Sequence, residues 1–322
     1  MKILLTADWH LHYDYQFENH SSDSKTSLLK KIFRKEHSEA VISKMEKIIQ
    51  QEKISLVIHN GDLMEHYPNE KGLHSKEAFE MTQKMIRQFE TRNKVPLLLN
   101  MGNHESGYTQ ESLPLATTAG RITRKSIHNF LKLANRETLY HSQKIDECTI
   151  ILIPYLFAEK NSADLDLEQE KNTILSKLKQ DLQKNERILI FLHDPDSLTD
   201  ERLAALIHHY RSRIRYIFCG HIHSHLSIII LRFFSHITFF RLFKPFRLML
   251  NRQLSKKFDP STADRIIAYL QKNRHIFQLY TKHKIVTIPA LDGMFGWGSG
   301  FWVLDTKNCR LRHSRKFKSA KN

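Results

Sequence analysis

The sequence predicts an α/β protein built largely on parallel strands. Short apolar runs rich in Ile, Leu and Val recur along the chain, and stretches with the 3.6-residue periodicity of amphipathic helices separate several of them. Alternation of this kind indicates βαβ units. The 322 residues and 41% hydrophobic content are sufficient for one large domain, or for a core domain that carries an insertion.

Six apolar runs are predicted as buried strands, at residues 3–6, 56–59, 96–100, 149–153, 188–192 and 216–219. Helices are predicted between several of them, at residues 41–49, 79–89, 173–182 and 204–210. Two later runs, 285–288 and 300–304, are predicted as further strands, and the turn-rich residues 293–298 precede the second of these.

The net charge of +16 is concentrated in two segments. Residues 226–257 contain seven Lys or Arg and no acid, and residues 307–322 contain seven more, again without an acid. The rest of the chain is nearly neutral. The pattern therefore indicates that the two basic segments contact an anionic partner surface, and it does not indicate an evenly basic groove. A Lys-rich tail that only keeps the protein in solution is the alternative for the C-terminal segment.

Cysteine usage indicates a reducing compartment. Cys148, Cys219 and Cys309 are far apart, odd in number and without a Cys-x-x-Cys spacing, so neither a disulfide framework nor a cysteine-zinc site is predicted. Only a few apolar residues separate Lys2 from Asp8, which is too short for the apolar region of a secretory signal. We therefore expect a cytoplasmic protein.

Side chains that are common metal ligands follow five of the predicted strands. Ligands of α/β proteins bind in the loops at the carboxyl ends of strands. The residues found there are, in chain order, Asp8 and His10, Asp62, Asn103 with His104 and Glu105, His193, and His221 with His223. A single Asp-x-His or Gly-Asp is more often a turn or a cap, so the prediction of a site depends on five such groups occurring together.

This set of donor atoms favours a pair of transition-metal ions. Carboxylate, imidazole and amide oxygen suit manganese, iron or zinc, whereas four histidines argue against a dedicated calcium or magnesium site. Phosphoryl transfer profits from two ions ~3.5–4 Å apart. Gly61 would let the backbone turn sharply, so that Asp62 lies between the ions. We expect two divalent cations, manganese in the first place and iron or zinc as alternatives.

The order of these groups resembles that of the calcineurin-like metallophosphoesterases. That family carries Asp-x-His, Gly-Asp, Gly-Asn-His-(Asp/Glu), a lone His and Gly-His-x-His, and all five blocks occur here in order between residues 8 and 223. The resemblance implies a four-layer α/β/β/α sandwich and a dimetal-dependent hydrolase in which a metal-bridging hydroxide attacks phosphorus. Residues 300–305 are also similar to the strand that closes the sheet in this family.

The resemblance also implies a role for each site residue. One metal would be held by Asp8, His10 and His223, the other by Asn103, His193 and His221, with Asp62 as the bridge. His104 would stabilise the transition state or act as general acid, oriented by Glu105. His193 has a more acidic surround than the family usually shows, and Asp194 is therefore a candidate supporting partner.

The most distinctive segment is residues 226–254, which are apolar, basic and placed directly after the last predicted ligands. On a helix, one face would carry Arg232, His236, Lys244, Arg247 and Asn251. Its internal charges and Pro245 argue against a bilayer span, which takes ~20 largely uncharged residues. An inserted amphipathic helical cap that contacts an anionic membrane surface through residues 226–257 fits better. A cap packed on the protein's own core, or a dimer surface, is the alternative.

Three functions are open at this point. The position of the cap beside His223 favours a lipid-linked or nucleotide-sugar phosphoester as substrate, at the inner face of the membrane. A DNA or RNA phosphodiesterase is the first alternative, because residues 6–11 resemble the DNA repair exonuclease branch of the family, although the near-neutral body lacks the spread of cations that a duplex requires. An inert membrane-associated metal-binding scaffold is the second alternative.

The domain organisation expected from these patterns has three parts. Residues 1–225 form the metallophosphoesterase core, residues 226–283 form the apolar, basic helical insertion, and residues 284–322 supply the closing strands and the basic tail. The sequence predicts no particular oligomeric state.

Overall fold

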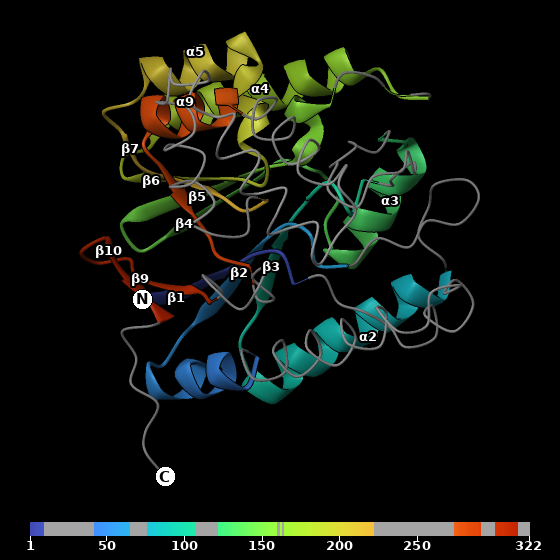
Figure 1. Ribbon diagram of the computed structural model, residues 1–322, viewed down its shortest axis with the longest axis vertical. Helices are drawn as coiled ribbons and strands as arrows, with labels where there is room; N and C mark the ends of the chain where they lie inside the picture. Colours follow the sequence, from blue (N-terminus) through green and yellow to red (C-terminus); the bar gives the residue numbers. More distant parts are fainter. Residues whose placement is uncertain are drawn as a thin grey trace, which may run out of the picture.

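The computed structural model describes residues 1–9, 42–64, 76–106, 122–159, 162, 164–221, 274–290 and 300–314. Within these residues the chain forms two five-stranded sheets, and helices cover the outer face of each sheet (Figure 1). The predicted α/β class and the four-layer arrangement are confirmed. Most of the predicted helical cap lies outside the described residues.

The first sheet has the strand order β10-β9-β1-β2-β3. Its strands are β1 (Lys2–Thr6), β2 (Leu56–Asn60), β3 (Leu97–Asn100), β9 (Trp302–Asp305) and β10 (Arg310–His313). β1, β2 and β3 are parallel, whereas β9 runs antiparallel to β1, with Asp305 opposite Lys2. The carboxyl ends of β1, β2 and β3 therefore share one rim of the sheet, and the turn from β9 to β10 lies at the opposite rim.

The second sheet has the strand order β4-β5-β6-β7-β8. Its strands are β4 (His141–Ile145), β5 (Cys148–Ile153), β6 (Ile188–Leu192), β7 (Ile214–Cys219) and β8 (Ile285–Thr287). β5 to β8 are parallel, and β4 is antiparallel to β5. All eight predicted strands are present. The expected parallel pairing is correct for the central strands, while the outer strands β4, β9 and β10 make both sheets mixed.

Helices form the two outer layers (Figure 1). A helix at residues 42–51 and α2 (Lys76–Asn93) cover the first sheet, and α4 (Leu167–Lys184), α5 (Glu201–His209) and α9 (Arg274–His283) cover the second. The described chain also contains α3 (Arg124–Leu133) and the short 3-10 helices η2 (Tyr155–Ala158) and η3 (Pro195–Thr199). Among the described helices, none combines the length and the apolar character needed to cross a membrane.

The last helix bears on the expected insertion at residues 226–283. The end of the expected insertion forms α9. Within α9, Ile276 and Tyr280 are buried in the main hydrophobic core. This part of the segment therefore packs on the body of the protein, as expected of two residues four apart on one helix face.

A second hydrophobic cluster fills the space between the sheets. Phe191 of β6 and Phe218 of β7 are fully buried and stack with ring centroids 4.8 Å apart. They belong to the same cluster as Ile3, Leu5 and Ile58 from the first sheet. Each such side chain contributes roughly 1.5–3 kcal/mol by leaving water, so the inner faces of the two sheets hold each other in contact.

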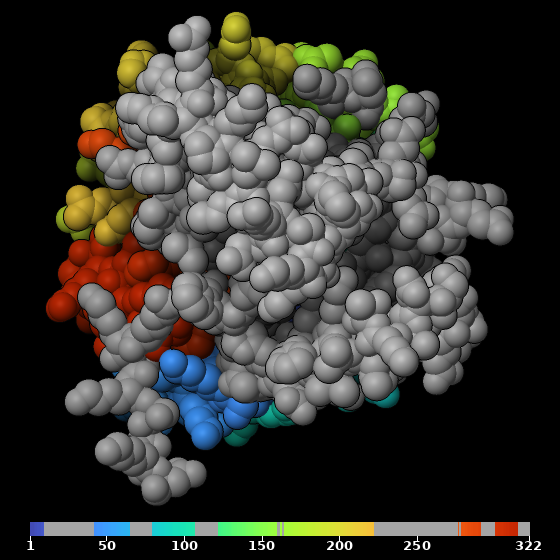
Figure 2. Space-filling view, in the orientation of Figure 1, coloured from blue at the N-terminus to red at the C-terminus, as the bar shows by residue number. Residues whose placement is uncertain are grey.

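Glu52, directly after the helix at residues 42–51, connects that helix to the central strand β1 and the edge strand β10 of the first sheet. Its carboxylate accepts hydrogen bonds from Lys2 Nζ, at 2.6 Å, and from both terminal nitrogens of Arg312, at 2.6 and 3.3 Å. The surface of β9 and β10, in red, accordingly lies beside that of the 42–51 helix, in blue (Figure 2). The hydrogen bonds from Arg312 and Lys2 lower the pKa of Glu52.

We expect Glu52→Gln to lower the free energy of unfolding at pH 7 by ~0.5–1 kcal/mol, the value of a partly exposed ion pair. Because the folded pKa of Glu52 lies below the unfolded value, the stabilisation is fully present above the unfolded pKa of about 4.3 and is lost as the pH falls through the folded pKa. Urea denaturation at pH 7 and pH 3 measures the difference between variant and parent. It should shrink at pH 3, and an equal difference at both pH values would contradict the prediction. Glu147→Gln is the control, because that side chain is 70% exposed.

Candidate metal centre

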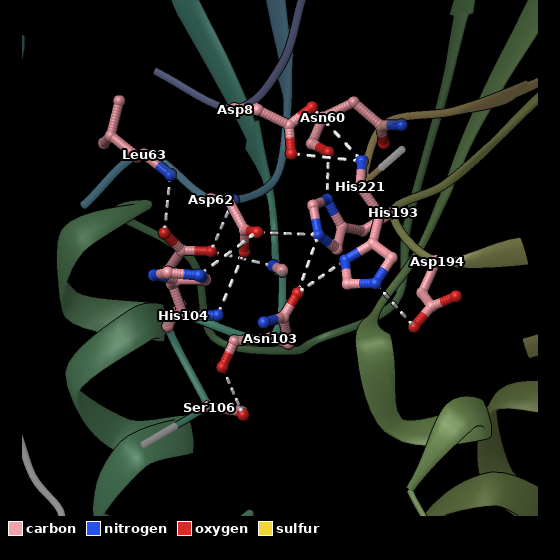
Figure 3. A network of polar contacts seen from close by, with 12 residues as sticks. Asp8, Asn60, Asp62, Leu63, Asn103, His104, Ser106, His193, Asp194 and His221 are labelled. Atoms are coloured by element: carbon pink, nitrogen blue, oxygen red, sulfur yellow. Dashed lines mark hydrogen bonds and ion pairs between the residues drawn. The ribbon is translucent and has the colours of Figure 1, made fainter. Parts of the chain in front are cut away.

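Five of the seven predicted metal ligands lie together at one rim of the sandwich (Figure 3). Those from the first sheet follow β1, β2 and β3 and are Asp8, Asp62 and Asn103; those from the second follow β6 and β7 and are His193 and His221. The other two, His10 and His223, lie outside the described residues. The predicted convergence of strand ends therefore extends across both sheets.

His193 lies at the centre of the cluster. Its Nδ1 is 2.8 Å from the carbonyl oxygen of Asn60, so this nitrogen carries a proton and donates it. Its Nε2 then faces two oxygens, Asp62 Oδ2 at 3.1 Å and Asn103 Oδ1 at 3.0 Å. In the neutral ring, Nε2 is also an acceptor, so three acceptor atoms meet at one buried point and require a cation between them.

Either a proton or a metal ion can supply the positive charge that these three acceptor atoms need. Burial opposes the charged form of His193, but the carboxylate of Asp62 and the hydrogen bond to it raise the pKa of His193 to about 10. The ring therefore holds a second proton when no other cation is present. Imidazole, carboxylate and amide oxygen are also the donors that transition metals accept, so the residues fit a divalent ion.

His221 completes the set of donors from the second sheet. Its Nδ1 is 3.0 Å from Asn103 Oδ1, and ligand atoms of Asp62, His193 and His221 all lie within 4.8 Å of one another. Its Nε2 is 3.7 Å from Asp194 Oδ2. Asp194 thus supports the outer side of His221, while its neighbour His193 occupies the centre of the site.

Three of the site residues adopt the left-handed backbone conformation that is uncommon outside glycine. The φ angles are 51° at Asp8, 57° at Asp62 and 61° at His221. Gly61, with φ 91°, makes the expected sharp turn before Asp62, and a Cβ atom there would lie 2.3 Å from His193 Nδ1. Strained conformations of this kind persist where the surrounding contacts enforce them, and they cluster at functional sites.

Glu105 organises the loop that carries Asp62. Its two carboxylate oxygens accept hydrogen bonds from the backbone amides of Asp62, Leu63, Met64 and Gly102, at 2.7 to 3.3 Å. Burial and the neighbouring charge of Asp62 raise the pKa of Glu105 to about 7. The carboxylate thus fixes backbone around the site, and its expected role of orienting His104 remains a prediction.

His104 stands on the other side of Asp62 from His193. Its backbone amide donates to Asp62 Oδ1 at 2.9 Å, and its Nε2 lies 3.7 Å from Asp62 Oδ2. The side chain is 15% exposed, in contrast to His193, which is fully buried. His104 is therefore the histidine of this pair that a ligand in solution can reach.

Two residues of the site were not predicted from the sequence, Asn60 and Asn100. They end β2 and β3 in register with each other, and Asn100 Nδ2 donates to Asn60 Oδ1 at 2.9 Å. Asn60 Nδ2 donates across to the carbonyl of Leu192, and Asn100 Nδ2 to that of Ile153. The available signal was an asparagine that ends an apolar strand two or three residues before a predicted ligand.

A two-sheet sandwich with carboxylate, imidazole and amide donors at its rim is the arrangement of a metal-dependent phosphoesterase. Residues 1–225 match the family model described as calcineurin-like phosphoesterase, and the chain belongs to that family. It is accordingly a metal-dependent phosphoester hydrolase, and the predicted resemblance is confirmed.

The chain is also similar, at low sequence identity, to solved structures. A dimetal phosphatase from Danio rerio is 13% identical, with a TM-score of 0.44, over 70% of this chain and 84% of that chain. GAP50, the anchor in the inner membrane complex of Plasmodium, is 12% identical, with a TM-score of 0.38, over 69% of this chain and 65% of that chain. No curated protein matches the chain.

We expect Gly102→Ala to damage the site while leaving the fold intact. The new Cβ atom would lie 2.3 Å from Asp62 Oδ1 and 2.9 Å from Glu105 Oε2, so the Asp62 carboxylate must move. Overpacking of this kind costs ~1–3 kcal/mol of stability. A displacement of about 1 Å at the reacting centre costs on the order of 100-fold in rate.

Phosphodiesterase assays of the purified Gly102→Ala variant measure the loss in rate, and thermal denaturation measures the loss in stability. Ser176→Ala, on the exposed face of α4, controls for handling of a variant protein. Full activity of Gly102→Ala would show that the position of Asp62 is not critical.

Proposed function

We propose that this phosphoesterase holds two divalent cations between Asp8, His10, Asp62, Asn103, His193, His221 and His223, with Asp62 as the bridging ligand. The observation that supports this most directly is the meeting of three acceptor atoms, His193 Nε2, Asp62 Oδ2 and Asn103 Oδ1, at a buried point. His10 and His223 each follow a described ligand by two residues in the chain, and both lie outside the described residues. The donor set favours manganese, with iron or zinc as alternatives.

Bound ions of this kind supply Lewis acidity, which neutralises phosphate charge and makes water a nucleophile near neutral pH. The protein's own residues position the reactants. The carboxylate of Asp62 is held from both sides, by the His104 amide and by His193. A cation or a substrate phosphate that binds there would therefore contact a carboxylate already fixed in position. Preorganised charge of this kind needs no rearrangement as the reaction proceeds.

His104 is proposed as the general acid. In the reaction the oxygen of water forms a bond to phosphorus and its proton passes to solvent. The bond from phosphorus to the leaving oxygen breaks, and the leaving oxygen takes a proton from His104, which regains one from solvent. In support of this role, His104 Nε2 lies 3.7 Å from Asp62 Oδ2, beside the carboxylate at the centre of the candidate site. Glu105 supports His104 indirectly, because it fixes the backbone of both Asp62 and Gly102.

We further propose that the substrate is a lipid-linked or nucleotide-sugar phosphoester presented at an anionic membrane surface. The support is the apolar, basic segment 226–257, which follows His221 and His223 directly in the chain. Seven cations without an acid favour anionic headgroups, and the apolar residues between them favour the interface. The division into a core at residues 1–225, an insertion at 226–283 and closing strands at 284–322 is part of the same proposal.

We expect Asp62→Asn to abolish hydrolysis of bis-p-nitrophenyl phosphate, with a loss on the order of 10³-fold. The amide keeps the shape of the side chain but removes the negative charge that binds cations. Calorimetric titration of the chelator-treated protein with Mn²⁺ should show a weaker or absent binding event. Asp305→Asn, at the end of β9 and the opposite rim, is the matched control and should behave as the parent. Unchanged Mn²⁺ binding by Asp62→Asn would refute the ligand assignment.

We expect the intact protein to sediment with vesicles of phosphatidylglycerol but not with phosphatidylcholine. Replacing Arg232, Arg241 and Lys244 together by Glu should weaken this binding by about 100-fold, since each cation near an anionic surface contributes ~1 kcal/mol. The parent and the triple variant both keep the whole chain, so the comparison does not depend on a deletion. Equal sedimentation of parent and variant removes the membrane proposal. Cleavage of plasmid DNA that is lost in Asp62→Asn would instead favour the nuclease.

A further inference from the structure

Two cysteines that are 161 residues apart in the chain meet between the sheets. Cys148 begins β5 in the second sheet, and Cys309 ends the turn from β9 to β10 in the first; their Sγ atoms are 3.6 Å apart. Cys148 is fully buried and Cys309 is 7% exposed. The sequence indicated no disulfide framework, because this separation gives no local signal.

The surroundings hold the two thiols in this position. Cys148 Sγ donates to the carbonyl of Thr306 at 3.4 Å, and the Tyr216 hydroxyl donates to the carbonyl of Cys309 at 2.9 Å. The backbone and side chain of Thr306 both donate to the carbonyl of Met1. The turn is thus fastened to both sheets, and neither sulfur is free to move far from the other.

We propose that Cys148 and Cys309 are a redox-active pair, which closes an intersheet disulfide on exposure to hydrogen peroxide and reopens in the presence of thiol reductants. The thiolate of Cys309 attacks one peroxide oxygen, the O–O bond breaks, and water leaves after protonation, giving a sulfenic acid on Cys309. The sulfur of Cys148 then attacks that of Cys309, the S–S bond forms, and hydroxide leaves and takes the proton of Cys148 as a second water. Two thiols lose two electrons and two protons, and one peroxide becomes two waters.

The two cysteines have different parts in this sequence because their environments differ. Cys309 is 7% exposed whereas Cys148 is fully buried, so peroxide in solution reaches Cys309 first. Burial and the adjacent Cys309 raise the pKa of Cys148 to about 12, so Cys148 stays protonated until its partner is oxidised. The S–S bond is ~2.05 Å long, so formation of the disulfide requires the two sulfurs to approach by roughly 1.5 Å.

The disulfide would join the sheets at the rim opposite the metal centre. Asp305 pairs with Lys2 at the start of β1, whereas Asp8 follows the end of the same strand. We therefore expect oxidation to raise the melting temperature without changing the rate of phosphoester hydrolysis. Closing a long loop restricts the unfolded chain most, and a rise of about 5 °C is expected for a chain of this size.

The test uses the reduced, chelator-treated full chain, exposed to hydrogen peroxide at a few equivalents. Thiols titrated under denaturing conditions should fall from three to one, and a non-reducing digest should contain the peptides of Cys148 and Cys309 linked, two hydrogens lighter than the sum. The melting temperature should rise and should return after dithiothreitol.

Three variants make the result specific. Cys148→Ser and Cys309→Ser should each prevent both the crosslink and the shift in melting temperature, and the second covers the case in which the first fails to fold. Cys219→Ser is the matched control, because Cys219 is also buried and free but ends β7. It should retain the crosslink. Three remaining thiols after treatment of the parent, or a link that contains Cys219 or joins two molecules, would overturn the proposal. None of these outcomes depends on the metal centre, so this inference and the proposed function fail separately.

Discussion

Hydrogen bonds from two asparagine side chains hold the two sheets in register directly below the metal centre. Asn60 and Asn100, on the first sheet, donate to carbonyl oxygens of Leu192 and Ile153 on the second. Apolar packing between the sheets is strong but has no preferred direction, so it resists separation better than sliding. Hydrogen bonds fix direction and distance. Since the donor atoms come from both sheets, the precision of the site depends on this connection.

The same region has to tolerate negative charge away from water. Asp8, Asp62 and Glu105 are each at most 5% exposed, and an isolated buried carboxylate is costly. Backbone amides provide part of the compensation: His221 donates to Asp8, His104 donates to Asp62, and four amides donate to Glu105. The neutral amide dipoles leave the net negative charge in place. The site is therefore prepared to attract cations, and its loops are rigid before they arrive.

Sequence reasoning was most successful where burial leaves a pattern. The central strands are continuous apolar runs, and the residues that follow them, such as Asp62 and His193, identified the rim correctly. The outer strands β4 and β10 were missed because their sequences, His-Ser-Gln-Lys-Ile and Arg-Leu-Arg-His, are polar. An edge strand is exposed on more sides and needs no apolar alternation.

Contacts between distant parts of the chain were the other omission. Asn60 ends a strand as many asparagines do, and only its partners in the second sheet make it part of the site. The approach of Cys148 to Cys309 likewise follows from the way β9 and β10 close the first sheet. Residue type and spacing predict what a strand end can bind, whereas the packing of two sheets decides which strand ends meet.

The left-handed backbone at Asp8, Asp62 and His221 has a consequence for engineering the stability of this protein. Glycine adopts this conformation without strain, so glycine at any of these positions would relax the backbone locally. Each such exchange would also delete a donor atom from the rim. Selection for survival of heating alone would not protect these proposed ligands, so a screen for more heat-resistant forms has to score turnover in the same round.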